Sequence, residues 1–293
     1  TQLHKLTASD AAASDYFGEK LAISGNYVIV GARWTDDHGS GSGSAYIFDV
    51  VTGNEIKKIT ASDAVTEDEF GMAVAIDGNY IIVGARYNDD GGSSSGSAYI
   101  FGPTEDSLLK ITNDSPNLIV NGTVVSDAIT TDAIVSKSNI LDNLSVGKEF
   151  SFSKEIKITA SDGVAGKRFG CSVDIDDNYA IVGAHYDNKT YIYNLHTGAE
   201  IHTLISSDGQ TGQFGVGVAI SGNYAIVGAR TAGTYDGRAY IFNVQTGYEL
   251  HILDSDTTDA SAYFGEDVDI DGNYAIVGAK YEYHATTNRY GHA

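Results

Sequence analysis

The sequence predicts an all-β fold built from repeated four-stranded units, and three observations carry this prediction. One phrase recurs five times along the 293 residues, in forms such as SGNYVIVGA at 24–32 and DGNYAIVGA at 271–279. No segment shows the 3.6-residue periodicity of an amphipathic helix. Glycine is abundant, at 34 residues, and proline is scarce, at 2, which indicates an ordered chain that turns often.

Each repeated unit is predicted to form four short strands joined by turns. A Phe-Gly pair precedes the first strand, and a Gly-Asn turn leads into an apolar second strand such as YVIV. A tyrosine-rich third strand such as SAYIFD follows, and a Thr-Gly turn leads to a fourth strand such as NEIKKIT. Four strands in every ~45 to 50 residues are typical of the blades of a β-propeller.

The array divides the chain into three parts. We expect residues 1–102 to form two propeller blades and residues 154–293 to form three more, the last of them incomplete. Residues 103–153 carry β-like alternation but lack both the Phe-Gly pair and the Gly-Ala pair. This segment is as long as one unit, and two interpretations stay open: a degenerate blade in the ring, or an inserted β segment.

Composition excludes several classes of partner. The chain has 18 Lys plus Arg against 39 Asp plus Glu, and 18 − 39 gives a net charge of −21, so we expect no binding to nucleic acid. Its single cysteine permits neither an internal disulfide nor a cysteine-based zinc site. No stretch approaches the ~18 consecutive apolar residues of a membrane helix, so we expect no membrane span.

Phe-Gly before the first strand and Val-Gly-Ala at the end of the second occur in all five units. In this the chain resembles the FG-GAP repeat family, which includes the blades of integrin alpha-subunit propellers and of many bacterial secreted and surface proteins. The LTASD and GSAYIF phrases are most similar to the bacterial form. The resemblance implies a β-propeller, usually extracellular and used for recognition or adhesion, and it implies no particular ligand. We expect an extracellular location or one at a cell or virion surface.

Many members of that family bind calcium through a DxDxDG-type loop between the first two strands. Here the loop is shortened to a turn such as Ser24-Gly25-Asn26, which offers too few of the six to eight oxygens that calcium takes. Only Asp267, Asp269 and Asp271 match the pattern, and strand alternation alone also explains their spacing. We keep these three as a candidate metal site and expect no other cofactor.

Two sets of charged residues recur at matching positions. A basic residue follows every Gly-Ala pair and an aromatic residue comes next in four units, which gives the candidate ligand-binding set Arg33, Trp34, Arg86, Tyr87, His185, Tyr186, Arg230, Lys280 and Tyr281. An aspartate precedes every Phe-Gly pair, at Asp10, Asp63, Asp162, Asp208 and Asp256. Both sets are expected at one end of the blades. Either they pair as a structural ring of ions, or part of the first set binds an anionic or sugar ligand.

The sequence therefore favours a non-catalytic extracellular recognition or adhesion module that binds a glycan or protein ligand through loops on one face, with loops 35–44 and 88–97 on that face. An alternative is a structural component of a viral or cell-surface assembly, which includes assembly with copies of itself. A third is an enzyme that uses Asp174 and Asp269 as acids lining a central channel.

Overall fold

The computed structural model describes residues 2–103, 118–120, 123–125, 154–233, 236–255, 262–281, 283–284 and 288–289. The chain divides into two compact units, Thr1–Ile100 with Ile156–Ala293, and Phe101–Glu155. The described residues form strands and turns with no helix, so the predicted all-β class is confirmed. Accordingly, no described helix is long and apolar enough to cross a membrane.

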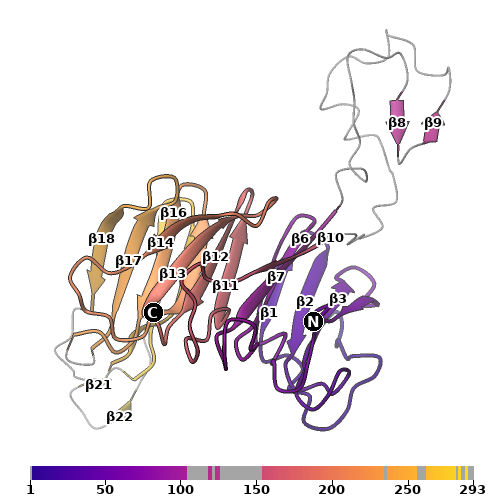
Figure 1. Cartoon of the computed structure of the whole chain (residues 1–293), viewed down its shortest axis with the longest axis horizontal. Coiled ribbons are helices and arrows are strands. Elements are labelled where there is room, and N and C mark those ends of the chain that lie inside the picture. The colour runs from indigo at the N-terminus through magenta and orange to yellow at the C-terminus, as the bar shows by residue number, and fades with distance from the viewer. Residues whose placement is uncertain are drawn as a thin grey trace. The chain divides into compact units, whose positions relative to one another are not determined.

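Three of the sheets in the first unit contain four antiparallel strands in chain order (Figure 1). Their first strand follows or begins with a Phe-Gly pair, and the strand with the Val-Gly-Ala phrase comes second. The first sheet consists of β1 (Leu21–Ser24), β2 (Tyr27–Ala32), β3 (Ser44–Asp49) and β4 (Glu55–Ile59). The other two consist of β11 (Ser172–Asp176), β12 (Tyr179–Ala184), β13 (Lys189–Asn194) and β14 (Glu200–Leu204), and of β15 (Phe214–Ser221), β16 (Tyr224–Ala229), β17 (Arg238–Asn243) and β18 (Glu249–Asp254).

The remaining four-stranded sheet is interrupted in sequence. It has the order β10-β7-β6-β5, from β5 (Ala73–Asp77), β6 (Tyr80–Ala85), β7 (Ser97–Gly102) and β10 (Lys154–Ile158). Residues 103–153 therefore enter the chain between the third and fourth strands of one blade, which supports an inserted segment over a separate blade. Within the second unit, β8 (Leu118–Val120) pairs antiparallel with β9 (Thr123–Val125); the rest of 104–153 lies outside the described residues.

The fifth repeat is shorter in the described part of the chain. Strand β19 (Phe264–Asp271) pairs with β20 (Tyr274–Ala279), and the two form a sheet of their own. Strands β21 (Tyr283–His284) and β22 (Asn288–Arg289) pair with each other in a separate two-stranded sheet.

Successive blades pack face to face through their first two strands. The first strands β1, β5, β11, β15 and β19 follow one another as neighbours, and each of the last four also contacts the second strand of the preceding blade. Between the third and fourth four-stranded sheets, for example, Ile181 and Ile192 pack with Val218 and Ile220 in one buried cluster. Alternate residues of each strand thus serve two different cores, which is why the second strands are apolar on both faces. The predicted propeller-type blades are confirmed.

Two glycines make the close approach between blades possible. The glycine of each Val-Gly-Ala phrase in the first four units faces the carbonyl oxygen of the next Phe-Gly glycine. A Cβ built on Gly31, Gly84, Gly183 or Gly228 would lie 2.0 to 2.1 Å from that oxygen. Only glycine fits such a contact, so the two most regular phrases of the sequence meet in space.

In the four blades with four strands, the phenylalanine of the Phe-Gly pair packs on a tyrosine of its own blade. Phe70 contacts the ring of Tyr99 edge-on, with centroids 5.5 Å apart, and the same contact recurs with Tyr46, Tyr191 and Tyr240 in the other blades. These four tyrosines are fully buried and lie on the third strands. Their hydroxyl groups point to the blade end at which the charged residues gather.

Candidate functional site

Each aspartate that precedes a Phe-Gly pair, where it is described, accepts a hydrogen bond from the third-strand tyrosine of its blade. The bonds join Tyr46 to Asp10, Tyr99 to Asp63, Tyr191 to Asp162 and Tyr240 to Asp208, at 2.7 to 3.3 Å. Each of these aspartates also pairs with a cation, which is Lys58, Lys157, Lys189 or Arg238 respectively. Asp256 lies outside the described residues. We call these four clusters the Asp-Tyr-cation clusters.

The cation in these clusters comes from two different strands. In the first two blades it is Lys58 or Lys157 on the fourth strand, whereas in the next two it is Lys189 or Arg238 at the start of the third. A hydrogen bond from Lys58 lowers the pKa of Asp10, and one from Lys189 lowers that of Asp162. A positive charge therefore lies beside the aspartate in each of the four blades, although the strand that supplies it changes.

The basic residues after Gly-Ala do not pair with these aspartates, in contrast to one of the two expected arrangements. Arg33 binds Glu19 at 2.7 Å and Glu69 at 3.1 Å, and Arg86 binds Glu69 at 2.9 Å. The Glu69 side chain is only 5% exposed and links the first blade to the second. The physical reason is that cations of the third and fourth strands already pair with the aspartates. The arginines therefore pair with glutamates that lie beside the Phe-Gly pairs.

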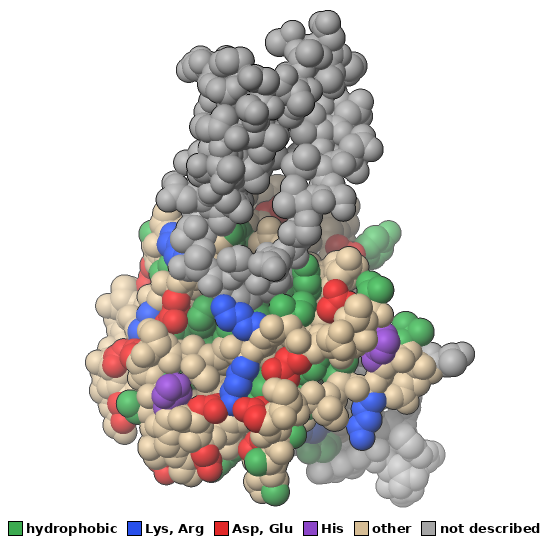
Figure 2. Space-filling view, turned by 90° about the vertical axis from the view of Figure 1, so that its right-hand side faces the viewer, with side chains coloured by type: hydrophobic (Ala, Val, Ile, Leu, Met, Phe, Trp, Pro, Cys, Tyr) green, Lys and Arg blue, Asp and Glu red, His purple; other side chains and the backbone are tan. Residues whose placement is uncertain are grey.

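Farther along the rim, Arg230 is held in the same way. It pairs with Glu266 of the next blade at 2.8 Å and donates a hydrogen bond to Gln213. Lys280 contacts the ring of Tyr281, with its Nζ 5.3 Å from the ring centroid, and no ion pair to it is found among the described residues. Figure 2 shows acidic and basic side chains interspersed over one face, as expected where most charges have partners.

Arg168 is the exception among the rim arginines. It comes immediately before the Phe-Gly pair of the third unit, and its guanidinium lies between two tyrosines, 4.9 Å from the ring centroid of Tyr87 and 4.1 Å from that of Tyr186. No carboxylate among the described residues pairs with it. Tyr186 is 49% exposed, so the stack is open to solvent on one side. We call Tyr87, Arg168 and Tyr186 the stacked-arginine site.

His185 lies beside this stack but does not add a charge near neutral pH. Its ring is 4.6 Å from that of Tyr186, and its Nδ1 lies 2.9 Å from the Sγ of Cys171. Burial, reinforced by the charges of nearby arginines that include Arg168, lowers the pKa of His185 to about 4. The sequence places His185 at one of the basic positions after Gly-Ala, and the lowered pKa favours a neutral imidazole there. Burial likewise raises the pKa of the Cys171 thiol.

The rim near the first blade carries Trp34, whose indole lies 6.4 Å from the ring of Tyr16 and 5.9 Å from the guanidinium of Arg33. Trp34 borders an open, shallow depression of about 390 Å³ that Asp10, Asp15, Asp36, Asp37 and Lys58 also line. The adjacent loop is ordered from within, since Asp36 accepts a hydrogen bond from the Gly41 N–H at 2.9 Å. Asp89 does the same for Ser94 in the equivalent loop.

The three candidate metal ligands Asp267, Asp269 and Asp271 are exposed and alternate with the buried Val268 and Ile270. Asp269 accepts a hydrogen bond from the N–H of Ile270. Among the described residues, the one group of acids close enough to share an ion is elsewhere, at Asp77, Asp176 and Asp177. Side chains of a strand alternate between its two faces, so a strand with one solvated face and one buried face accounts for the DxDxDG spacing.

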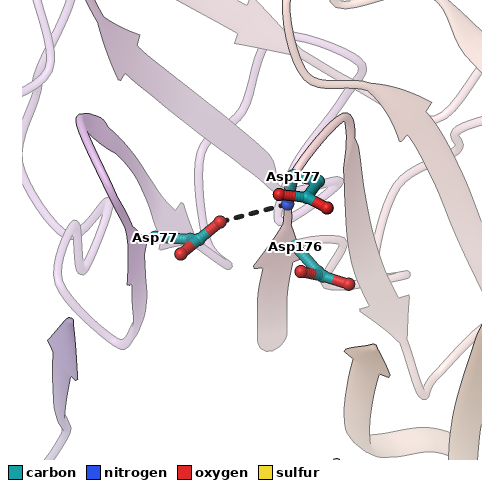
Figure 3. Close-up of side chains that lie close together, drawn as sticks. All are labelled: Asp77, Asp176 and Asp177. Atoms are coloured by element: carbon teal, nitrogen blue, oxygen red, sulfur yellow. Dashed lines mark hydrogen bonds between the residues drawn. The ribbon is translucent and has the colours of Figure 1, made fainter. Parts of the chain in front are cut away.

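The group at Asp77, Asp176 and Asp177 belongs to a hydrogen-bonded latch between blades (Figure 3). The carboxylate of Asp77 accepts a hydrogen bond from the Asp177 N–H at 3.1 Å, and that of Asp176 accepts one from Gly222 in the following blade. Ser24 and Ser221 accept equivalent bonds from Gly78 and Gly272, each at 3.1 Å. At all four junctions, the last residue of one first strand therefore holds the next blade's turn.

Asp174, a possible channel acid, is also engaged between blades. It accepts a hydrogen bond from the Ile220 N–H at 2.8 Å. Burial raises the pKa of Asp174 to about 7, and the negative charge of Asp269 acts in the same direction. A perturbed carboxyl can mark a catalytic acid, but burial, which outweighs the opposing hydrogen bond from Ile220, accounts for the raised pKa without one.

Blades of this architecture, joined by repeated close contacts and carrying a polar rim, define a protein of the β-propeller class. The FG-GAP repeat family model matches residues 1–48, 54–101, 152–199, 198–242 and 248–293. The chain belongs to the FG-GAP repeat family. Repeats of this family suggest a recognition or adhesion module and are typical of extracellular proteins.

Solved structures show similar chains at low identity. A crystal structure of the computationally designed Ika8 protein is 16% identical, with a TM-score of 0.46, and the match covers 91% of this chain and 69% of that one. Hydrazine synthase of Kuenenia stuttgartiensis is 12% identical, with a TM-score of 0.47, over 85% of this chain and 53% of its own. A search of curated proteins gave no match.

Proposed function

We propose that the protein is a non-catalytic recognition module that binds an acidic ligand, with an acidic glycan as the favoured class, at the stacked-arginine site. The observation that carries this proposal is the contrast between Arg168 and its neighbours. Arg33, Arg86 and Arg230 are neutralised by glutamates, whereas Arg168 is held by aromatic rings and keeps its N–H groups for a further acceptor.

The chemistry of the stack suits a planar anion. A guanidinium donates two parallel hydrogen bonds to a carboxylate, and its aromatic neighbours fix its orientation in advance. The half-exposed ring of Tyr186 offers an apolar surface beside that anion, which is the arrangement sugar rings use for stacking. Because the chain as a whole carries a charge of −21, an acidic ligand must be drawn by this local site and not by bulk attraction.

A recognition role at an extracellular or cell surface, including a virion surface, is part of the same proposal. It rests on the family and on the position of the rim loops, because loops held on a rigid sheet scaffold are common binding sites. A protein ligand that presents an acidic side chain is the runner-up occupant of the same site.

The test compares two arginines of the same rim. Arg168→Ala and Arg33→Ala are screened, with the unmodified protein, against an array that holds acidic glycans and their neutral counterparts. We expect Arg168→Ala to abolish binding of acidic glycans and to lose only the small stabilisation of its two ring contacts. We expect Arg33→Ala to keep the binding and lose stability, because it leaves Glu69 with one partner instead of two.

Arg168→Lys is the conservative control. It keeps the charge but loses the planar fork, so we expect weak residual binding. Binding that is equal for acidic and neutral glycans, or that survives Arg168→Ala, contradicts the proposal. Capture of an acidic peptide in place of every glycan assigns the site to the protein ligand.

A further inference from the structure

We propose that the second blade contains a self-modification site, at which the amine of Lys157 attacks the side-chain amide of Asn88 and forms an isopeptide bond with release of ammonia. Lys157 lies on the fourth strand β10, and Asn88 lies in the loop between β6 and β7. The bond forms once in each chain and involves no turnover. It therefore goes beyond ligand recognition at the stacked-arginine site and uses different residues.

The amine and the amide are already in contact. The Lys157 Nζ donates a hydrogen bond to the Asn88 Oδ1 at 3.1 Å. The amide carbon is one bond beyond that oxygen, and the flexible stem of the lysine allows the amine to reach it. Attack of an amine on an amide is slow between separate molecules, and two groups held this close react as if at very high concentration. Asn88 is only 2% exposed, so water competes poorly for the same carbon.

Two further donors point at the amide oxygen. The Ser97 hydroxyl donates to the Asn88 Oδ1 at 2.8 Å, and the Asp90 N–H donates to it at 3.4 Å. Ser97 is fully buried. Negative charge builds on this oxygen when the amine attacks, and donors fixed in a buried site stabilise that charge.

A proton donor lies beside the nitrogen that must leave. The Asn88 Nδ2 donates a hydrogen bond to the Asp68 carboxylate at 3.2 Å. Asp68 is only 2% exposed, and burial raises the pKa of its carboxyl. A carboxyl that holds its proton next to a leaving nitrogen can act as a general acid. The amide of Asn88 thus has its nucleophile at one atom and its acid at another.

The reaction balances without an oxidant or a cofactor. The Lys157 ammonium passes one proton to Asp63, whose Oδ2 lies 2.5 Å from Nζ. The amine then attacks the Asn88 Cγ, and Nδ2 leaves as ammonia with the proton of Asp68. Nζ gives its second proton to Asp90, the other carboxylate that pairs with it. Of these two protons one returns to Asp68 and the other converts ammonia to ammonium, so a cation and an amide give an isopeptide and a cation.

The first blade shows that the ion pairs of the lysine do not require an asparagine. Lys58 pairs with two aspartates there, as Lys157 does in the second blade. Thr35 stands at the position of Asn88 in the first blade, and it has no amide that could react. Asn88 therefore adds a reactive group to a cluster that holds its charges without one.

The later blades lack the same combination. In the third blade Asp187 stands at the position of Asn88 and Lys167 at that of Asp68, and the two form an ion pair at 2.9 Å. The fourth and fifth units have Gly212 and Ala262 at the position of Asp68. Amine, amide and buried acid coincide in the second blade alone, which is the blade that residues 103–153 interrupt. The bond would join the strand after that segment to the loop before it.

The first test measures the intact mass of the full chain and the peptides that trypsin releases from it. We expect a mass lower by one ammonia molecule and a branched peptide that joins Asn88 to Lys157. Trypsin does not cleave after an acylated lysine, so one digest should be cut after Lys58 and remain uncut after Lys157. A chain of full mass that is cut after both lysines, even after prolonged incubation at neutral pH, would overturn the proposal. Loss of ammonia without the branched peptide would overturn it as well.

Variants assign the roles of the three groups. Lys157→Arg keeps a cation without the amine and Asn88→Ala removes the leaving group, so both should have their full mass. Asp68→Asn still accepts a hydrogen bond but supplies no carboxyl proton, and we expect the branched peptide to accumulate at least about 100-fold more slowly. Lys58→Arg is the matched control and should react as the unmodified chain does. An unchanged rate in Asp68→Asn would refute the role of that carboxyl.

A cut within residues 103–153 gives an independent measurement. A protease recognition sequence is placed in that segment, and the denatured chain is cleaved there. The two fragments should stay joined on a denaturing gel, because the isopeptide bond connects residues on either side of the cut. They should separate when the same chain carries Lys157→Arg. Fragments that separate in both proteins would contradict the proposed bond.

Discussion

The Cα of Gly31 faces the carbonyl oxygen of Gly71 so closely that a methyl group on Gly31 would lie 2.1 Å from that oxygen. The first glycine closes the second strand of one blade and the second follows the phenylalanine that opens the next. The obstacle is backbone, so a larger side chain cannot be accommodated by a rotamer change. The two dipeptides that give the repeat its regularity are therefore a single interface.

Gly31→Ala should destabilise the protein by about 2–4 kcal/mol, because the blades must separate to admit the methyl group. Gly278→Ala is the matched control, since its nearest neighbour is a backbone oxygen at 3.5 Å, an ordinary contact. Urea unfolding at neutral pH compares the two. Equal losses for both variants would refute the steric explanation.

Moving a lysine between strands tests the Asp-Tyr-cation clusters. Lys189→Ser should cost no more than about 1 kcal/mol, since the pair with Asp162 is partly solvated. Adding Thr203→Lys, at the fourth-strand position that Lys58 holds in the first blade, should recover most of that loss. A double variant as unstable as the single one would show that the two sources of charge are not equivalent.

The same variants have a defined pH dependence. The Lys189 hydrogen bond lowers the pKa of Asp162, so this pair contributes stability above the ordinary aspartate pKa and loses it as pH falls through the lowered value. The deficit of Lys189→Ser should thus be visible at pH 7 and vanish in strong acid. Unfolding curves at pH 7 and about pH 2 measure the difference.

Asp174→Asn should stabilise the protein at alkaline pH. Burial raises the pKa of this carboxyl from 3.8 to about 7, so the folded chain holds a proton that the unfolded chain releases between those values. Folding is therefore opposed increasingly as pH rises from about 4 to 7, by about 4 kcal/mol at most. The asparagine can still accept from Ile220, and unfolding free energies at pH 4 and pH 8 should show a gain for the variant at pH 8 alone.

His185→Gln should act in the opposite sense. Burial lowers the imidazole pKa from 6.5 to about 4, so the unfolded chain binds a proton in this range that the folded chain does not. The unmodified protein thus loses stability as pH falls from 6.5 to 4, by about 3 kcal/mol at most, and the variant should lack this part of the loss. If the unfolding free energy falls by the same amount between pH 7 and pH 4 in the variant and in the unmodified protein, the His185 imidazole is protonated in the folded state and the explanation is refuted.

Sequence alone predicted the blades because their signals are local. A Phe-Gly pair, a Gly-Asn turn and a Gly-Ala pair each impose a backbone geometry that repeats with the period of the array. The sequence also holds a signal that residues 103–153 are inserted within a blade. KEIKIT at 154–159 is similar to NEIKKIT at 54–60, which is a fourth strand. That likeness assigns the strand after the segment to the blade before it.

The charged contacts were harder to predict because they depend on pairing across strands and between blades. Lys58 and Lys189 reach equivalent aspartates from different strands, which no comparison at one aligned position can show. Arg168 was missed because the residue before Phe-Gly varies freely, as Tyr16, Glu69, Gln213 and Tyr263 in the other units. One regularity was available only from the structure: all five of these residues have positive φ angles of 54 to 61°.

Strands β7 and β10 are neighbours in one sheet although 51 residues, 103–153, separate them in sequence. The two ends of that segment are consequently anchored about one strand spacing apart, ~5 Å, by a scaffold that does not need the segment for its pairing. A hairpin loop of a few residues should be able to replace it, and so should an unrelated domain whose termini are adjacent. The connection between β7 and β10 is thus a site where other polypeptide segments can be inserted while the four strands of the sheet keep their pairing.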